Sequence, residues 1–247
     1  MRQELPHLPI VALLTVLVMG IAPAGSAQTL THRYSFSDPV GSTSFADSVG
    51  GASWNGTLQG TASLDGSSLQ LDGAGGFATL PSGIISGSAQ VSIEFWASFS
   101  ANNPVWTRVF AFGEQNGSGG ELTGLDYCHY AGGDWQNLNL TSTNNANAYA
   151  NNPGGLNGAT NVHVCIIVDP VNNQMYYYNG TAVASNPGFH AASVPALSGL
   201  NDTVCLLGKS LYDVDALLDG AIDEFRVYQS ALSPAAVALN DAAGPDS

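Results

Sequence analysis

The feature that most constrains this chain is a two-residue hydrophobic period, which recurs in short runs along most of its length. In VSIEFWASF, residues 91–99, every second side chain is apolar and falls on one face, while Trp96 is among the positions opposite. Gly, Asn, Asp and Pro separate the runs, and no helical period lies between them. The pattern predicts an all-β fold, either an antiparallel sandwich or a barrel. The other runs are HRYSF (32–36), SLQLD (68–72), GFATL (76–80), RVFAFG (108–113), LTGLDYCHY (122–130), WQNLNLTS (135–142), VHVCIIVD (162–169), QMYYYNG (174–180), TVCLLG (203–208) and AIDEFRVY (221–228).

Three connecting segments carry local signals. DPVNNQ, residues 169–174, predicts a hairpin, because Pro suits a turn and Asn tolerates a positive φ. Ser233 is a good helix N-cap, and Pro234 suits the first helical position, so AAVALNDAA predicts a short C-terminal helix. Residues 144–161 are rich in Asn and Gly and have no period. They predict a long surface loop, either a plain linker or a variable binding loop.

The N-terminus has the pattern of a targeting segment. Arg2 precedes the apolar run IVALLTVLVMGIA, which gives way to small residues in PAGSAQ. This predicts a signal peptide over residues 1–27, cut after Ala27 or alternatively after Ser26, with an uncleaved anchor as the other interpretation. No other run is apolar enough to span a membrane. The remaining ~220 residues, 28–247, suit one β-sandwich domain. We therefore expect a secreted or otherwise extracytoplasmic protein.

The charge balance is strongly acidic. The chain has 19 Asp and Glu against 5 Lys and Arg, for a formal net charge of −14. Such a chain repels nucleic acids and anionic membrane surfaces, so we expect neither as a partner. Neutral ligands and cations are compatible with it. A hydrophobic content of 45% argues against disorder despite the net charge.

The cysteines are Cys128, Cys165 and Cys205. An exported protein can form a disulfide, and an odd number leaves one thiol over. Cys165 and Cys205 both lie in strand-like runs, which makes them the candidate pair. Three buried free thiols are the alternative. The spacing fits no zinc motif.

Several segments occur in a characteristic order along the chain: HRYSF, ADSVGGASWNGTL, SLQLDGAGGFATLP, VSIEFWASF, VHVCIIVDPVNNQMYYYNG and LLDGAIDEFRVYQSALSP. The set resembles the laminin G-like domains of the concanavalin A-like lectin/glucanase superfamily, of the type found in exported microbial proteins. GAIDEFRVYQSALS is the most specific of these segments. The chain departs from the pattern at Val162, where relatives often have an aromatic residue, and at Ala236, where a Glu would complete a capping box.

The resemblance implies a jelly roll, in which two antiparallel sheets pack face to face and the first and last strands are adjacent. It also implies long loops on one side that carry ligands and, in many relatives, one structural calcium ion. Most relatives are binding or adhesion modules. Some hydrolyse β-glucans or similar polysaccharides.

The hydrolytic relatives carry paired carboxylates on one strand, spaced Glu-x-Asp-x-Glu or Glu-x-Asp-x-x-Glu, because one acts as nucleophile and one as acid/base. In this chain no glutamate is followed two positions later by Asp. No nucleophile elbow, phosphate loop or metal-binding helix motif is present either. We therefore expect no catalytic residues. A glycoside hydrolase or lyase of the same fold with an unrecognised site is the alternative. The glutamates are Glu4, Glu94, Glu114, Glu121 and Glu224.

The last predicted strand contains the densest charge in the chain. Strand alternation puts Asp223 and Glu224 on opposite faces, so they cannot flank one bond. Glu224 and Arg226 share a face with Ile222 and Tyr228 and are expected to form an ion pair at the surface, or to pair with His32 or Arg33. The other face carries Ala221, Asp223, Phe225 and Val227.

Asp223 is a carboxylate on an apolar face and needs a partner. Asp47 follows the first predicted strand and could reach Asp223 if the first and last strands pair. The two carboxylates predict a structural calcium site, Ca²⁺ being an ion that binds several oxygens. Hydrogen bonds from backbone N–H groups to Asp223 are the alternative.

Two tryptophans are candidates for ligand binding, because sugar rings stack on aromatic faces. Trp106 and Trp135 lie in predicted loops or at strand ends, with Asp134 and Asn137 close to the second as polar partners. Packing of both rings inside the sandwich is the alternative. Together these features predict an exported, lectin-like module that binds a polysaccharide or glycan without cutting it. A structural envelope or matrix protein is a further alternative.

Overall fold

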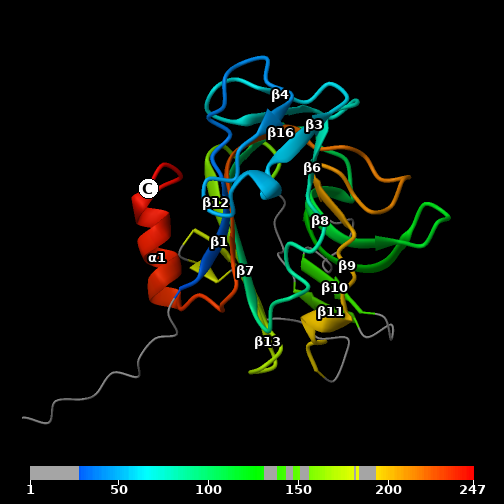
Figure 1. Cartoon of the computed structure of the whole chain (residues 1–247), viewed down its shortest axis with the longest axis vertical. Coiled ribbons are helices and arrows are strands. Elements are labelled where there is room, and N and C mark those ends of the chain that lie inside the picture. The colour runs from blue at the N-terminus through cyan, green and yellow to red at the C-terminus, as the bar shows by residue number, and fades with distance from the viewer. Residues whose placement is uncertain (1–27, 131–137, 143–146, 151–155, 181, 184–192) are drawn as a thin grey trace, which may run out of the picture.

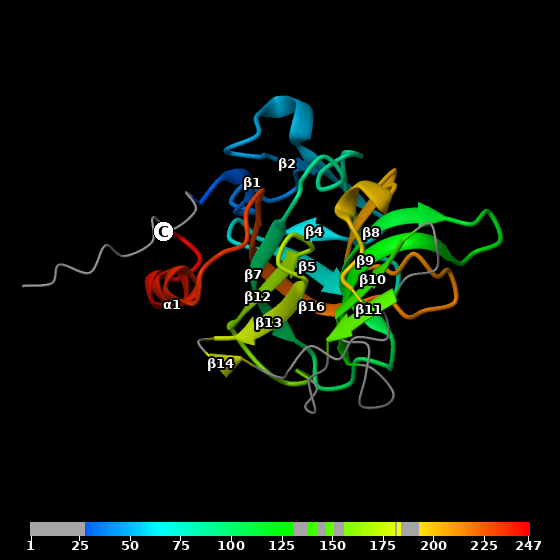
Figure 2. The ribbon, with the colours of Figure 1, turned by 90° about the horizontal axis from the view of Figure 1, so that it is seen from below.

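The computed structural model describes residues 28–130, 138–142, 147–150, 156–180, 182–183 and 193–247. Within them the chain forms two antiparallel sheets that pack face to face (Figures 1 and 2). Sheet A has the order β14 (Ala182–Val183), β13 (Gln174–Asn179), β12 (Val162–Asp169), β7 (Val91–Phe99), β16 (Asp219–Tyr228), β5 (Leu69–Asp72), β4 (Ser63–Leu64), with β1 (Leu30–Tyr34) paired to β16. Sheet B has the order β11 (Asn147–Ala150), β10 (Leu138–Thr141), β9 (Glu121–Tyr130), β8 (Thr107–Gln115), β15 (Val204–Leu207), β6 (Phe77–Leu80), β3 (Gly56–Gln59), β2 (Ser44–Phe45).

The helical segments are short. The 3₁₀ turns η1 and η2 cover Ala52–Trp54 and Leu197–Gly199, and α1 covers Pro234–Ala243. The predicted all-β sandwich with a short C-terminal helix is confirmed. None of the helices in the described ranges is long and apolar enough to cross a bilayer.

Aromatic side chains join the two sheets across the core. Phe225 on sheet A stacks on Phe95 at 6.2 Å between ring centroids, and it meets Phe110 and Phe112 of sheet B edge-on at 5.7 and 5.9 Å. All four rings are fully buried. Burial of one such ring stabilises the folded state by about 1.5–3 kcal/mol. The period-two face predicted for residues 91–99 supplies this core, as expected.

The closing strand β16 differs from its prediction at one position. Its pairing with β7 skips a residue between Ile222 and Glu224, so Asp223 is the extra residue of a β-bulge. Ile222 therefore packs in the core with Phe225 and Val227 rather than beside Glu224. The predicted assignment of Ile222 and Asp223 to faces was wrong, because a bulge shifts the alternation by one residue.

The first and last strands pair, as predicted, and a buried ion cluster ties them together. Glu224 Oε1 accepts hydrogen bonds from Arg33 Nε at 2.5 Å and from Arg226 Nε at 2.6 Å. Arg226 Nη2 donates to the backbone carbonyls of Pro245 and Ser247. The predicted Glu224–Arg226 pair is confirmed, but it is not at the surface: Glu224 is fully buried and Arg226 is 4% exposed.

Helix α1 lies on the outer face of sheet A, on the side away from sheet B (Figures 1 and 2). Ser233 Oγ accepts a hydrogen bond from the backbone N–H of Ala236 at 3.2 Å, which confirms the predicted N-cap. Val237 packs against the apolar patch that includes Cys165 and Tyr228. The helix therefore covers this patch of the outer face and anchors the end of the chain.

A polar contact fixes α1 over the sheet. Asn240 Nδ2 and Tyr228 Oη donate to Glu94 Oε2 at 2.9 and 3.0 Å. His163 Nε2 lies 2.8 Å from Glu94 Oε1, and its ring stacks on Trp96 at 4.4 Å. His163 is thus a packed, hydrogen-bonded histidine.

The segment predicted as a long surface loop contains a strand. Residues 147–150, expected within a loop, form strand β11, which pairs with β10 through Leu138↔Ala150 to Thr141↔Asn147. That part of the loop prediction was wrong, because backbone pairing with a neighbouring strand outweighs a weak side-chain pattern.

Of the two cysteine alternatives, the structure has free thiols at Cys165 and Cys205. Cys165 is in the patch under α1 and Cys205 is in the core on sheet B, so they lie in different layers.

Candidate functional site

The outer face of sheet B carries a polar cluster with aromatic residues beside it. We define the Arg108 cluster by Trp106, Arg108, Glu121, Asp126, Asn139, Tyr212 and Asp215. Its members come from β8 and the residue before it, from β9 and β10, and from the loop between β15 and β16. That loop runs beside the β8–β9 turn (Figures 1 and 2), where the backbone N–H of Asp213 donates to Gly119 O.

Arg108 is the centre of the cluster. Its Nε donates to Asp126 Oδ1 at 2.9 Å, and Nη1 donates to Asp215 Oδ2 at 2.9 Å and to the carbonyl oxygen of Trp106 at 2.7 Å. The residue is 6% exposed. Burial alone would lower the pKa of Arg108, but Asp126 and Asp215 raise it, so the guanidinium stays charged. A buried cation with this many fixed acceptors has a single orientation.

Two aromatic rings lie against this guanidinium. Its carbon is 5.6 Å from the Trp106 ring and 5.8 Å from the Tyr212 ring. Both rings are partly exposed. Trp106 has a φ of 69°, an unfavourable conformation for a residue with a side chain, and the bond from Arg108 to its carbonyl helps to hold it there. The cluster therefore presents two partly exposed aromatic rings that rest on the buried Arg108 guanidinium.

Glu121 reaches the cluster through a bulge that the sequence pattern does not reveal. Gln115 pairs with Glu121 but Glu114 pairs with Thr123, so Leu122 is an extra residue in β9. The bulge brings Glu121 to the same face as Asp126, five positions away. Gly124 lies between them, and a Cβ atom there would be 2.5 Å from Glu121 Oε2. The absence of a side chain at Gly124 makes room for the Glu121 carboxylate.

Glu121 and Asp126 form a pair of interacting carboxylates. Asn139 Nδ2 lies 3.0 Å from Asp126 Oδ2 and 3.4 Å from Glu121 Oε1, which links the two. Burial, and next the charge of Asp126, raise the pKa of Glu121 to about 8. Glu121 therefore holds a proton at neutral pH and can donate it to Asp126 in a hydrogen bond. The amino-acid sequence does not reveal this pair, because a spacing of five on a regular strand puts two residues on opposite faces.

The predicted ligand-binding residues have different outcomes. Trp106 lies in the Arg108 cluster with its ring partly exposed. Asp134, Trp135 and Asn137 lie outside the described residues. Trp106 as a ligand contact stays a prediction, and the structure adds Tyr212 as a second ring beside it.

Asp47, one of the two residues predicted to bind calcium, is occupied by hydrogen bonds. Its Oδ2 lies 2.6 Å from His32 Nδ1, and its Oδ1 accepts the backbone N–H groups of Arg33, Val49 and Gly50. Burial alone would raise the pKa of Asp47, but the bonds from His32 and the backbone lower it. Asp47 thus ties β1 to the loop after it, and its bonds leave little access for a cation.

Asp223, the other residue predicted to bind calcium, is partly buried on the bulge of β16. Burial, and next the charges of Asp65 and Asp246, raise its pKa. Among the described residues, no group of three or more His, Cys, Asp or Glu side chains is arranged to hold a metal ion. The residues present do not fit the predicted calcium site well, and Ca²⁺ binding stays a prediction.

Comparisons with solved structures show relatives of this fold. Domain 4 of an extracellular GH43 arabinanase from Geobacillus stearothermophilus, in complex with arabinotriose, is 23% identical with a TM-score of 0.61, and the match covers 85% of this chain and 97% of that domain. The receptor binding domain of botulinum neurotoxin mosaic serotype C/D is 14% identical with a TM-score of 0.63, covering 87% of this chain and 51% of that one. A Trypanosoma rangeli sialidase, in complex with sialic acid, is 14% identical with a TM-score of 0.55, covering 85% of this chain and 32% of that one. At these identities the likeness establishes the fold alone.

Sequence comparison identifies the family. No curated protein shows significant sequence similarity to the chain. The family described as the concanavalin A-like lectin/glucanases superfamily matches residues 72–238, which run from the end of β5 into α1. This match covers more than half of the chain, and the two-sheet sandwich agrees with it. The chain therefore belongs to the concanavalin A-like lectin/glucanase superfamily.

Proposed function

We propose that the chain is an exported, lectin-like module that binds a polysaccharide or glycan at the Arg108 cluster and does not cut it. The observation that carries the proposal is the pair of partly exposed rings, Trp106 and Tyr212, that both lie against the buried Arg108 guanidinium. A sugar ring has an apolar C–H face that stacks on an aromatic ring. Rings that are already fixed lose little conformational entropy when a ligand binds.

Polar groups suited to sugar hydroxyls surround these rings. Burial, and next the charges of Glu121 and Asp126, raise the pKa of Tyr212 to about 12, so its hydroxyl stays a hydrogen-bond donor. Asp215 lies partly exposed beside it and can accept. The acidic net charge disfavours a polyanionic ligand. The arabinanase domain whose structure contains arabinotriose is matched over 97% of its length, which supports a saccharide as the ligand class for the chain.

A glycan array of the mature protein, with and without Ca²⁺, tests the proposal. We expect signals from one group of neutral glycans, and Trp106→Ala and Tyr212→Ala should each weaken them about tenfold, the loss of one stacked ring. Val214→Ala is the matched control, because Val214 is 90% exposed on the same loop. A blank array contradicts the proposal and favours a structural envelope or matrix protein.

The Glu121–Asp126 pair favours a second candidate, a polysaccharide hydrolase or lyase. A protonated carboxyl beside an ionised one is the combination that glycoside hydrolysis uses. However, retaining enzymes hold the two groups about 5 Å apart, with the sugar between them, and inverting enzymes hold them farther apart. Asn139 Nδ2 lies 3.4 Å from Glu121 Oε1 and 3.0 Å from Asp126 Oδ2, so an amide group of the chain bridges the two carboxyl groups, which supports binding over cleavage. Release of reducing sugar from a panel of β-glucans and arabinans, abolished by Glu121→Gln, would establish the enzyme instead.

A further inference from the structure

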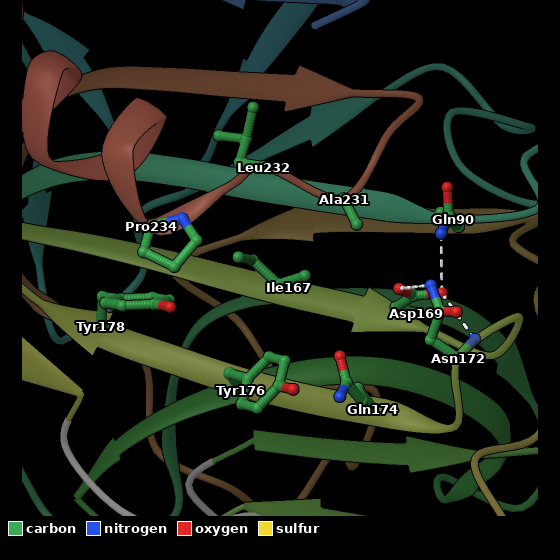
Figure 3. Close-up of a pocket in the computed structure, with 10 residues that line it drawn as sticks. All are labelled: Gln90, Ile167, Asp169, Asn172, Gln174, Tyr176, Tyr178, Ala231, Leu232 and Pro234. Carbon is green, nitrogen blue, oxygen red and sulfur yellow. Dashed lines mark hydrogen bonds between the residues drawn. The ribbon is translucent and has the colours of Figure 1, made fainter. Parts of the chain in front are cut away.

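A pocket of about 530 Å³ lies on the outer face of sheet A, beside the start of α1. It is on the opposite side of the sandwich from the Arg108 cluster. Its floor and walls come from β12, β13 and the segment that leads into α1 (Figure 3). Pockets of this volume hold small ligands in other proteins, and all of its lining residues are described here.

One side of the pocket is aromatic and apolar. Tyr176 and Tyr178 alternate along β13 with Tyr177, which points into the core, so the first two share the outer face. Their rings lie one after the other along the strand, and Ile167 and Leu232 close the apolar surface (Figure 3). Tyr178 is 6% exposed, which fixes its position, whereas Tyr176 is more accessible. This side suits the C–H face of a ring.

The other side of the pocket is polar and held in one arrangement. Asp169 is 4% exposed; its Oδ1 accepts from Gln90 Nε2 at 2.7 Å, and its Oδ2 accepts from Asn172 Nδ2 at 2.7 Å. Burial alone would raise the pKa of Asp169, but the bonds from Gln90 and Asn172 lower it, so the carboxylate is ionised. An ionised carboxylate only accepts, and both amide groups must therefore turn their NH₂ towards it.

That orientation leaves acceptors for a ligand. Gln90 Oε1 and Asn172 Oδ1 accept no hydrogen bond from the described part of the chain, and the hydroxyl of Tyr176 is also without a partner there. In Figure 3 this hydroxyl points towards the amide of Gln174. The pocket thus offers acceptors beside a fixed negative charge. It favours a ligand with many hydroxyl donors and no negative charge.

We infer that this pocket is a second saccharide site, which takes a neutral sugar residue with its ring face on Tyr176 and its hydroxyls on the amides of Gln90 and Asn172. The inference goes beyond binding at the Arg108 cluster, because it depends on different residues on a different sheet. The ligand class follows from the pocket itself: aromatic rings for the ring face, acceptors for the hydroxyls, and Asp169 to exclude acidic sugars.

Calorimetric titration of the whole chain with defined trisaccharides tests the inference. The probes are arabinotriose, xylotriose, cellotriose and mannotriose as neutral sugars, and sialyllactose and trigalacturonic acid as anionic ones. We expect at least one neutral probe to bind in a way that Tyr176→Ala weakens about tenfold, as for the loss of one stacked ring. Tyr176→Phe keeps the ring and should stay within about threefold of the unmodified chain, since only one exposed hydroxyl is lost. Asn172→Ala should weaken the same probe, and the anionic probes should bind more weakly than the neutral ones.

The controls separate this site from the Arg108 cluster. Thermal unfolding verifies that Tyr176→Ala still folds, and Trp106→Ala should leave the Tyr176-dependent binding unchanged. If Trp106→Ala has no effect on any probe while Tyr176→Ala does, the function proposed for the Arg108 cluster fails and the pocket stands. If none of the probes binds, or if Tyr176→Ala binds every neutral probe as the unmodified chain does, the inference is wrong.

Discussion

At the scale of single residues, Glu121 shows how a backbone irregularity creates chemistry. The bulge at Leu122 turns Glu121 to the outer face of sheet B, and Gly124 leaves space for its carboxylate beside Asp126. Two carboxylates in contact cannot both ionise at little cost, so Glu121 keeps its proton. The folded chain is therefore more stable when Glu121 is protonated than when Glu121 is ionised.

This gives a pH dependence with a definite sign. The ordinary pKa of Glu121 is 4.5, and the folded chain raises it to about 8. Between these values the folded chain binds a proton that the unfolded chain has released, so stability falls as pH rises through this window and levels off above it. The slope is at most about 1.4 kcal/mol per pH unit.

Replacement of Glu121 by Gln should remove this slope. The amide is neutral at every pH and keeps a donor for Asp126. We expect the free energy of unfolding of Glu121→Gln to change less than that of the unmodified chain between pH 5 and 8, window limits that follow from the two pKa values. Urea unfolding across this range is the measurement, with Glu114→Gln on the neighbouring strand as the control. Parallel stability curves for the two chains would contradict the assignment.

The site was only partly predictable for the same reason. Trp106 could be singled out, because an aromatic residue beside Pro and Asn suggests an exposed position. Glu121 could not be singled out, because its contact with Asp126 depends on the bulge at Leu122. The residue types of β9 do not predict that bulge. Arg108 and Asp215 are far apart in sequence and meet only when the loop after β15 folds over β8.

At the scale of elements, the strands with strong alternation were predictable and those defined by pairing alone were not. Strand β7 has a full apolar face, and its face assignment was correct. Strand β11 lies in an Asn-rich stretch whose residues do not alternate, and it exists because β10 offers a free edge. The bulge in β16 likewise depends on its pairing with β7, and the local sequence did not predict it.

Helix α1 was predictable from its cap, and the cap can be tested. Ser233 satisfies the N–H of Ala236, and no glutamate completes a capping box there. Ser233→Ala should lower the free energy of unfolding by about 1 kcal/mol. Chemical unfolding followed by circular dichroism measures it. Ser247→Ala, an exposed serine near the same helix, is the control and should change stability by less than half as much; equal effects would argue against a cap.

The ion cluster between β1 and β16 should be much more sensitive. Arg226→Met keeps much of the volume of the side chain but leaves Glu224 and Glu94 buried without this cation. We expect a loss of about 3 kcal/mol in the free energy of unfolding, because removal of one partner from a buried ion cluster leaves buried charge that the remaining partners, Arg33 among them, compensate only in part. Lys209→Met breaks the exposed pair with Asp213 and should cost less than about 1 kcal/mol. Urea titration compares the two, and a loss at Arg226 no larger than that at Lys209 would contradict the buried-pair interpretation.

At the scale of the whole molecule, the two proposed saccharide sites lie on opposite outer faces of the sandwich. The Arg108 cluster is on sheet B, and the pocket lined by Tyr176 is on sheet A beside α1. Sites that face apart on a rigid body cannot both engage one short oligosaccharide. They can each hold a different strand of a polymer.

The chain should therefore bridge polysaccharide strands. Added to a neutral polysaccharide that it binds, the unmodified protein should raise turbidity and the hydrodynamic radius by light scattering, with a maximum at intermediate protein concentration. Trp106→Ala and Tyr176→Ala should each bind the polymer but fail to raise either signal. Equal turbidity from a single-site variant would show that bridging has another cause.

The pairing of β1 with β16 also bears on how the protein is made. Strand β1 is synthesised first. Its partner β16, at Asp219–Tyr228, is synthesised last of the strands. Arg226 then needs the backbone of Pro245 and Ser247 to complete its hydrogen bonds. Contacts between such distant parts of the chain form late and slowly. A ribosome that has made all but the last thirty or so residues therefore holds a chain in which sheet A still lacks the strand between β7 and β5.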